Sequence, residues 1–343
     1  MSDSRSPRPR VLSGIRPTGA GFHLGNYLGA VRQWAAMQDE AECFFFVADL
    51  HALTETIDPA HLRARTRASA AELLALGVDE RSAVFAQSHL PEHAELAWVL
   101  SCLTGFGEAS RMTQFKDKAG ETSGGASVGL FTYPVLQAAD ILLYRPQSVP
   151  IGEDQRQHLE LTRDLAQRFN ARYGETFVVP APYAGKPGAR IKDLQDPTRK
   201  MSKSTGGAGT LWVLDEPRAL TKKVRSAVTD TGREVVFDVE GKPGISNLLT
   251  ILATVQRVEV AAVEEQFSGR GYGDFKTAVA EAVVEEFAPV RARYDALVAD
   301  PAELDRVLLA GAERARDVAV STLAAVRERV GLLAPLPGRA RAR

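Results

Sequence analysis

Two lysines in the middle of the chain stand three residues apart in the stretch Lys200–Ser204 (Lys-Met-Ser-Lys-Ser), and the glycine-rich run 205–210 follows directly. A lysine ammonium is a compact charge with three donors on a flexible stem, which suits it to polyphosphate. The spacing and the glycines therefore indicate a cationic loop that holds phosphate groups. A solvated basic loop would have the same composition, so the interpretation depends on whether the chain supplies the rest of a nucleotide site.

A second segment with phosphate-binding character, His23-Leu24-Gly25-Asn26, lies near the amino terminus. Gly25 lets the backbone approach a ligand closely, and the helix predicted from there directs free N–H groups and its positive dipole end at that ligand. The His23 imidazole can donate to phosphate oxygens. An ordinary turn with an exposed histidine is the alternative. The glycine spacing matches neither the dinucleotide fingerprint nor the Walker P-loop, so neither of those sites is predicted.

The elements that carry these segments alternate between strand and helix. Short apolar runs at 11–13, 44–48 and 83–86 predict strands covered on both faces, and a helical pattern follows each of them. Two further helices are predicted at 134–143 and 155–170. The alternation predicts an α/β fold with a doubly wound, parallel, Rossmann-like sheet, in which ligands bind at the carboxyl ends of the strands.

After about residue 215, every segment with a clear pattern is helical. The predicted helices are 216–230, 243–257, 273–288, 289–298 and 301–331, and prolines mark most of their starts. We therefore expect an appended all-helical domain. The expected division is a catalytic domain at 10–205 and a helical region at 206–333, whose last helix can pack back on the catalytic domain. Residues 1–9 and 334–343 are expected to be disordered.

The composition is that of a globular protein and limits its partners. Of the 343 residues, 45% are hydrophobic and 25% are charged, and the formal net charge is −1, so any contact with an anionic polymer must come from a local patch. No signal peptide and no run apolar enough to span a membrane are visible. Cys43 and Cys102 are expected to be reduced, which favours a cytoplasmic protein. The histidine pair at metal-type spacing, His89 and His93, is interrupted by Pro91, so no metal site is predicted.

The turn at 23–26 and the loop at 200–204, taken together, resemble the paired signatures of class I aminoacyl-tRNA synthetases. The chain is most similar to the bacterial tryptophanyl-tRNA synthetases, from about Leu12 to about Leu332. Further segments in the family's order support the resemblance: 13–15, 25–27, 111–116, 133–134, 138–142, 152–155 with His158, 161–165 and 226–230.

The resemblance implies ATP-dependent activation of L-tryptophan to tryptophanyl-adenylate, followed by transfer to tRNA(Trp). Positioning and charge stabilisation would carry the catalysis, without a covalent enzyme intermediate. The residues that match ATP-contacting segments are Arg16, Pro17, Thr18, Gly25, Asn26, Gly152, Glu153, Asp154, Ile191, Lys200, Met201, Ser202, Lys203 and Ser204. Those expected to act in catalysis are His23, Asn26, Lys116, Lys200, Lys203 and Ser204. Mg²⁺ is expected to be held mainly by the ATP phosphates.

Asp140 matches the family residue that accepts the indole N–H of tryptophan. A buried carboxylate without that donor would be left unsatisfied, so phenylalanine should be rejected strongly. A charge on a helix surface is the alternative, which the apolar neighbours at 138–142 disfavour. The other residues expected around the amino acid are His51, Gln137, Val149, Ile151 and Gln155, and plain strand core is the alternative for Val149 and Ile151.

The resemblance also implies tRNA(Trp) as a partner and a homodimer. The helical region would contact the anticodon. Lys222, Lys223 and Arg225 lie on one short helical stretch and can contact phosphate, although a solvated face has the same composition.

Three positions depart from the bacterial pattern. Arg16 stands where glutamine is common, His23 where threonine is frequent, and Gln137 where methionine is common. Gln137 lies one helical turn before Asp140 and could hydrogen-bond it or the indole. Two other interpretations stay open: a tyrosyl-tRNA synthetase, which shares the fold and the aspartate, and a regulatory paralogue without catalysis. The segment 152–155 disfavours the first, and the intact lysine loop disfavours the second.

Overall fold

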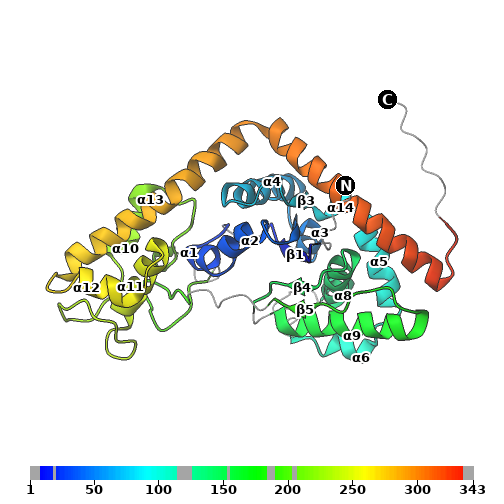
Figure 1. The fold of residues 1–343 in the computed structure, drawn as a ribbon, viewed down its shortest axis with the longest axis horizontal. Helices are drawn as coiled ribbons and strands as arrows, with labels where there is room; N and C mark the ends of the chain where they lie inside the picture. The colour runs from blue at the N-terminus through cyan, green and yellow to red at the C-terminus, as the bar shows by residue number, and fades with distance from the viewer. Residues whose placement is uncertain are drawn as a thin grey trace, which may run out of the picture.

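The computed structural model describes residues 8–17, 21–113, 126–152, 155–183, 190–202 and 207–334. Part of the predicted site, namely Thr18, Lys116, Glu153, Asp154, Lys203 and Ser204, lies outside the described residues. The molecule has a sheet flanked by helices, a lobe of shorter helices beside it, and two long helices that meet at an angle above both (Figure 1).

Among the described residues, five parallel strands form one sheet in the order β3-β2-β1-β4-β5. The strands are β1 (Arg10–Ile15), β2 (Glu42–Val47), β3 (Ala83–Ala86), β4 (Ser148–Val149) and β5 (Ala181–Pro182). Strands β2 and β3 follow β1 on one side of the sheet, whereas β4 and β5 lie on its other side. The direction in which successive strands are added to the sheet therefore reverses between the neighbours β1 and β4. This confirms the predicted doubly wound parallel sheet, whose ligands bind beside such a reversal.

The helices of the first part connect these strands. They are α1 (Leu24–Asn26), the π-helix η1 (Tyr27–Val31), α2 (Arg32–Met37), α3 (Asp49–Ala52), α4 (Pro59–Ala75), the 3₁₀-helix η2 (Gln87–His89), α5 (Glu92–Ser101), α6 (Phe106–Ser110), α8 (Val128–Leu143) and α9 (Arg156–Tyr173). Those that follow the lysine loop are the 3₁₀-helix η4 (Gly207–Gly209), α10 (Pro217–Arg225), α11 (Pro243–Gln256), α12 (Val260–Gln266), α13 (Tyr272–Ala299) and α14 (Pro301–Val330).

Two helix boundaries predicted at prolines were wrong. Helix α8 begins at Val128 rather than at Pro134, and α13 continues through Pro289, where two helices were expected. A proline inside a helix removes one backbone hydrogen bond and costs about 3 kcal/mol. Both helices have long packing contacts, α8 against α5 and α9 and α13 against α10, α11 and α4, and this burial outweighs the local cost.

A separate apolar core covers each face of the sheet. The side chains of β2 alternate between them: Phe45 belongs to one core, and Phe44 and Phe46 belong to the other. The core around Phe45 continues without a break into the helical lobe, where it includes Leu249 of α11 and Val283 of α13. The sheet and the lobe therefore share an apolar interior.

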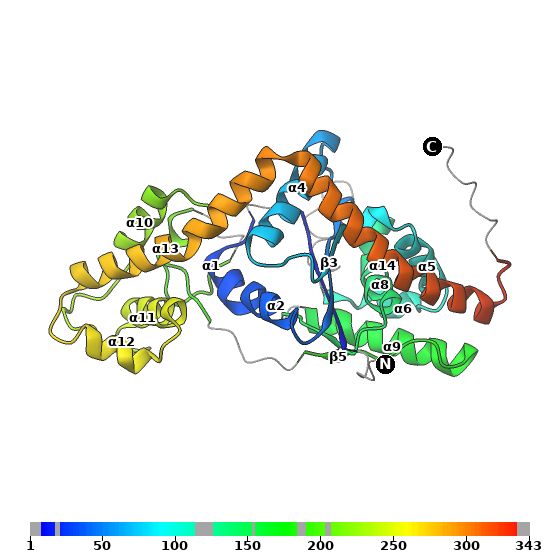
Figure 2. The ribbon, with the colours of Figure 1, turned by 45° about the horizontal axis from the view of Figure 1, so that its top comes forward.

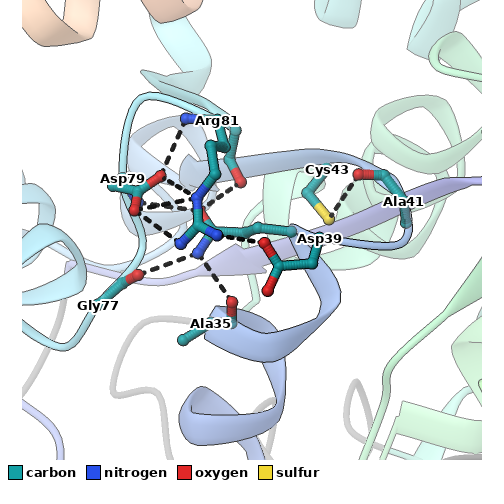
Figure 3. Close-up of polar contacts among 9 residues, drawn as sticks. Ala35, Asp39, Ala41, Cys43, Gly77, Asp79 and Arg81 are labelled. Atoms are coloured by element: carbon teal, nitrogen blue, oxygen red, sulfur yellow. Dashed lines mark hydrogen bonds and ion pairs between the residues drawn. The ribbon is translucent and has the colours of Figure 1, made fainter.

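A polar cluster fixes the amino ends of β2 and β3 (Figure 3). The buried Gln38 amide forms hydrogen bonds of 2.8 to 3.0 Å with Ala35, Gly77, Asp79 and Ser82. Arg81 pairs with both Asp79 and Asp39. Since these groups precede β2 or β3, they lie at the amino ends of the strands, where they stabilise the fold. The carboxyl ends of the strands are left for ligands.

Helix α14 covers the outer edge of the sheet at β3. It approaches so closely that a Cβ at Gly311 would stand 2.0 Å from the carbonyl oxygen of Val84. Arg314 donates to the backbone carbonyls of Glu80 and Ser82 beside the same strand. An uncovered edge strand exposes unpaired backbone groups, and α14 removes that exposure. Figure 2 shows α14 descending over β3 and α5 from its junction with α13.

Candidate active site

The His23–Asn26 turn is a helix start stabilised by its own side chains. The His23 Nδ1 accepts from the backbone N–H of Asn26 at 3.2 Å, and Asn26 Oδ1 accepts from the N–H of His23 at 3.4 Å. His23 is buried and its ring meets Trp212 edge to face, with centroids 6.1 Å apart. The alternative of an ordinary turn with an exposed histidine was therefore wrong, because this imidazole caps a helix under a tryptophan.

A buried carboxylate anchors the loop that leads into this turn. Glu72 of α4 accepts from the backbone N–H of Phe22 at 2.7 Å, and Gly21 adopts a positive φ of 90° directly against that carboxylate. Backbone hydrogen bonds then pair Phe22 and Leu24 with the strand-like segment 211–213. The turn is thus held between α4 and the chain that follows the lysine loop.

The predicted ATP residues Gly25 and Ile191 lie side by side. A Cβ at position 25 would stand 3.1 Å from the His23 ring and 3.6 Å from the Cβ of Ile191. Ile191 is buried, and its carbonyl accepts from the N–H of Met201 at 3.1 Å. A side chain at position 25 would crowd the His23 ring, and two segments far apart in the sequence meet here.

The stem of the lysine loop is an ordered antiparallel pairing. Lys192 lies opposite Lys200, and the N–H of Asp193 donates to the carbonyl of Arg199 at 3.0 Å. Asp193 is buried against Gly209, where a Cβ would stand 1.9 Å from the carboxylate. Lys200, Met201 and Ser202 thus leave a fixed stem close to the His23 turn.

The remaining predicted ATP residues follow strand ends. Arg16 and Pro17 come directly after β1, and Gly152 follows β4 after a short connection. Arg16 forms an ion pair of 2.8 Å with Glu55, so its guanidinium is already committed to a carboxylate. β1 and β4 are the two neighbouring strands between which the strand order reverses. Arg16, Pro17 and Gly152 therefore lie at the carboxyl ends of these strands, where doubly wound folds bind ligands.

The predicted recognition residue, Asp140, is a fully buried carboxylate with three protein donors. His51 Nε2 lies 2.7 Å from Oδ2, and Gln87 Nε2 and His93 Nδ1 each lie 2.7 Å from Oδ1. His51 follows β2, whereas Gln87 and His93 follow β3. The carboxyl ends of two neighbouring strands therefore converge on one helix residue.

Burial alone would raise the pKa of Asp140. The attraction of His51 and the hydrogen bonds from His51 and His93 outweigh this effect and hold the pKa at about 2. The carboxylate is therefore ionised at neutral pH. The alternative of a charge on a helix surface was wrong.

Gln137 and Gln155, predicted beside the amino acid, belong to a second polar chain. Tyr133 OH lies 3.2 Å from His158 Nε2, and His158 Nδ1 lies 2.9 Å from Gln155 Oε1. Gln137 Nε2 donates to the same Gln155 oxygen at 3.3 Å, and not to Asp140. The His51 ring faces Tyr133 edge to face, which brings the two chains together. Val149 is buried and Ile151 half-buried at the same end of the sheet.

Sequence reasoning missed Gln87, His93 and Tyr144. His93 Nε2 lies 2.9 Å from Tyr144 OH, so these residues extend the Asp140 network away from His51. The available signal was position: polar residues that directly follow a buried strand lie at the ligand-binding edge of a parallel sheet. His93 was instead considered only as one of a metal-type pair.

The basic residues of α10 divide into two roles. Lys223 donates to Asp215 at 2.7 Å and to the carbonyl of Thr210 at 2.8 Å, so it is a structural cation. Lys222 and Arg225, with Arg218, line an open hollow of about 670 Å³ on the outer face of the helix. All three of these cations are exposed to solvent.

Two further properties bear on function. In the described part of the chain, no group of three or more histidine, cysteine, aspartate and glutamate side chains is arranged to hold a metal ion. Within the same residues, no helix combines the length and apolar character needed to span a bilayer.

Comparisons with known proteins show which family the chain resembles. Residues 4–288 match the family model described as tRNA synthetases class I (W and Y). The chain is 60% identical to a tryptophan–tRNA ligase 2 from Streptomyces avermitilis over 331 residues, which are 96% of this chain and 98% of the relative.

Two solved structures share the fold over nearly the whole chain. The tryptophanyl-tRNA synthetase from Mycoplasma pneumoniae superposes with a TM-score of 0.83 at 37% identity, covering 95% of this chain and 98% of that one. The enzyme from Campylobacter jejuni, solved in complex with ADP and tryptophan, gives 0.82 at 35% identity, covering 94% of this chain and all of that one.

Proposed function

Because the chain belongs to the W and Y family of class I tRNA synthetases, we infer that it is a tryptophan–tRNA ligase. The tryptophan carboxylate attacks the α-phosphorus of ATP and pyrophosphate leaves. A ribose hydroxyl of tRNA(Trp) then attacks the acyl carbon and AMP leaves. Neither step requires a nucleophilic side chain, so the protein has to align the reactants and stabilise the charge that develops.

The observation that carries the substrate assignment is the buried, ionised carboxylate of Asp140. We propose that the indole N–H of tryptophan donates to it. Phenylalanine has no such donor, and a site built around a polar contact can reject the analogue that lacks it by roughly 10⁴–10⁵. The tyrosine phenol also donates, and here the similarity to tryptophan–tRNA ligases over nearly the whole chain favours tryptophan.

The proposed ATP site lies where the His23 turn meets the stem of the lysine loop. The contact of Gly25 with Ile191 supports a close approach of adenosine to the backbone. Asn26, Arg16, Pro17 and Gly152 would complete it, with Thr18, Glu153 and Asp154 assigned by the resemblance alone.

The proposed cations for the phosphates are Lys200, Lys203 and Lys116, assisted by Ser204. Their task is to stabilise the charge on the departing pyrophosphate, which needs donors that are already in place. We propose that Mg²⁺ binds to the ATP phosphates and water, because no carboxylate cluster for it exists among the described residues.

We propose tRNA(Trp) and a second copy of the chain as macromolecular partners. The cations on α10 and the helical region after 206 support tRNA binding, which would take place in the cytoplasm. Exposed apolar side chains on α5, α6 and α8 support a homodimer through this face. The division into a catalytic domain at 10–205 and a helical region at 206–333 remains a proposal, given the core that both share.

Amino-acid-dependent exchange of pyrophosphate into ATP tests the assignment, with tryptophan, tyrosine and phenylalanine supplied separately. We expect exchange with tryptophan and, with tRNA(Trp) added, formation of tryptophanyl-tRNA. Exchange with tyrosine alone would refute the substrate, and no exchange with any of the three would support the regulatory interpretation.

A further inference from the structure

The two oxygens of the Asp140 carboxylate have different environments. Among the residues that the structure describes, Gln87 and His93 donate to Oδ1, whereas His51 alone donates to Oδ2. Gln87 and His93 are completely buried, whereas His51 is 7% exposed. Oδ2 is therefore the oxygen on the more accessible side of the network. A carboxylate oxygen has two acceptor sites, and one protein donor leaves Oδ2 able to accept another.

Gln87 is fixed at both ends of its amide. Its Oε1 accepts from the backbone N–H of Leu50 at 3.1 Å, so Nε2 must be the group that donates to Asp140. Leu50 precedes His51 on α3. Gln87 directly follows β3. Its amide therefore links the end of β3 both to α3, which carries His51, and to Oδ1 of Asp140.

His93 is fixed in the same way by Tyr144. An ionised carboxylate only accepts, so His93 donates to it from Nδ1, and the other ring nitrogen, Nε2, lies 2.9 Å from the Tyr144 hydroxyl. Burial and the nearby Asp140 charge raise the pKa of Tyr144 well above its usual value, so the hydroxyl keeps its proton. A chain of hydrogen bonds therefore runs from Tyr144 through His93 to Asp140, and all three residues are shielded from water.

We propose that Gln87, His93 and Tyr144 are positioning residues for recognition of the amino acid: they hold Oδ1 so that Oδ2 presents its open acceptor site to the indole N–H. This inference rests on the proposed function. Without them the carboxylate could rotate, and either oxygen would turn toward the remaining donors. Because water does not compete in this site, each hydrogen bond has more effect than it would on the surface.

The test compares tryptophan with the analogue in which sulfur replaces the indole N–H, 3-benzothienylalanine. Equilibrium binding of both is measured for the wild type and for Tyr144→Phe, which removes a single hydroxyl. We expect tryptophan to bind about fivefold more weakly, as the loss of one buried hydrogen bond implies, and the analogue to bind as before. A purely structural role would weaken both ligands equally.

His93 supplies the second pair of variants. In His93→Asn the amide can replace Nδ1 as a donor, whereas in His93→Leu no donor remains. We expect the preference for tryptophan over the analogue to fall at least tenfold in the leucine variant and to be largely restored in the asparagine variant. Tyr272→Phe, which removes a partly buried hydroxyl bonded to Asp230 in the helical region, is the control and should leave the preference unchanged.

Bound tryptophan labelled with ¹⁵N at the indole gives an independent readout. The indole N–H resonance should move toward its free position in Tyr144→Phe, because its hydrogen bond to Asp140 is weaker. An unchanged preference and an unchanged resonance in Tyr144→Phe and His93→Leu would overturn the inference. A wild type without tryptophan-dependent exchange would instead refute the proposed function.

Discussion

At the scale of single residues, the ionisation of Asp140 links the stability of the fold to pH. Its pKa is about 2 in the folded chain, against about 3.9 in an unfolded one. The depressed value therefore contributes about 2 kcal/mol above pH ~4, and this contribution is lost as the pH falls toward 2. Asp140→Asn lacks it at every pH.

We expect Asp140→Asn to be less stable than the wild type at pH 7 and the difference to narrow between pH 4 and pH 3. Denaturant unfolding at several pH values measures both chains. A difference in unfolding free energy that stays constant over this range would show that the charge of the Asp140 carboxylate does not contribute to stability.

The sequence predicted some residues of the Asp140 network and missed others. Asp140 and His51 were identified because each matches a position in a family motif, and the structure joins them directly. Gln87 and His93 belong to no motif, and they reach Asp140 across 53 and 47 residues of chain. Such contacts depend on which strand ends are neighbours in the sheet, which no local pattern records.

At the scale of elements, prolines marked most helix starts correctly but not all of them. Pro59, Pro217, Pro243 and Pro301 do stand at helix starts, whereas Pro134 and Pro289 lie inside helices. The difference is tertiary, because long buried contacts offset the local cost in α8 and α13. β4 and β5 span two residues each, which is too short to produce an alternating pattern.

The contact between α14 and β3 depends on the absence of a side chain at Gly311. Gly311→Ala would place a methyl group on the Val84 carbonyl and force the helix away from the strand. We expect a loss of about 1–3 kcal/mol in unfolding free energy and faster hydrogen exchange in β3. Gly273→Ala in α13 is the control, since a Cβ there meets nothing within 4 Å. A neutral Gly311→Ala would show that α14 does not clamp the edge.

The outer face of α10 should bind the tRNA backbone. Lys222→Ala combined with Arg225→Ala removes two exposed cations, whereas Lys223 is left to its ion pair. We expect tRNA to bind about tenfold more weakly, with a shallower dependence on salt, because fewer counterions are released. Pyrophosphate exchange should not change. Arg63→Ala, an exposed arginine on α4, is the control. An equal loss in exchange and in tRNA binding would place α10 in the catalytic step instead.

At the scale of the whole molecule, the sheet and the helical lobe pack on each other and are not merely connected along the chain. The core around Phe45 runs into α11 and α13, and Tyr27 OH donates to Glu286 of α13 at 2.7 Å. The change of character near residue 215 predicted helices after that point, and the described residues there do form helices. It could not predict a shared interior, because a pattern of apolar residues shows that a face is buried and not what covers it.

Helices α5 and α6 both pack on α8, and all three helices present apolar residues to solvent. Trp98 of α5, Phe106 of α6 and Val128 of α8 are 71%, 79% and 77% exposed, and the Phe106 ring packs on Phe131, one turn beyond Val128. Large apolar side chains gathered on packed helices mark an interface, and a two-fold dimer would bury the same patch on both copies.

We therefore expect the wild type to sediment as a dimer and the double variant Trp98→Ser with Phe106→Ser to sediment as a folded monomer. Val239→Ser, which removes an apolar side chain that is 62% exposed in the loop before α11, should remain a dimer. Because α5 and α8 carry His93 and Asp140 on the faces turned inward, the interface would also brace the recognition network. The monomeric variant should then bind tryptophan more weakly, and a monomeric wild type with full activity would refute both the interface and this coupling.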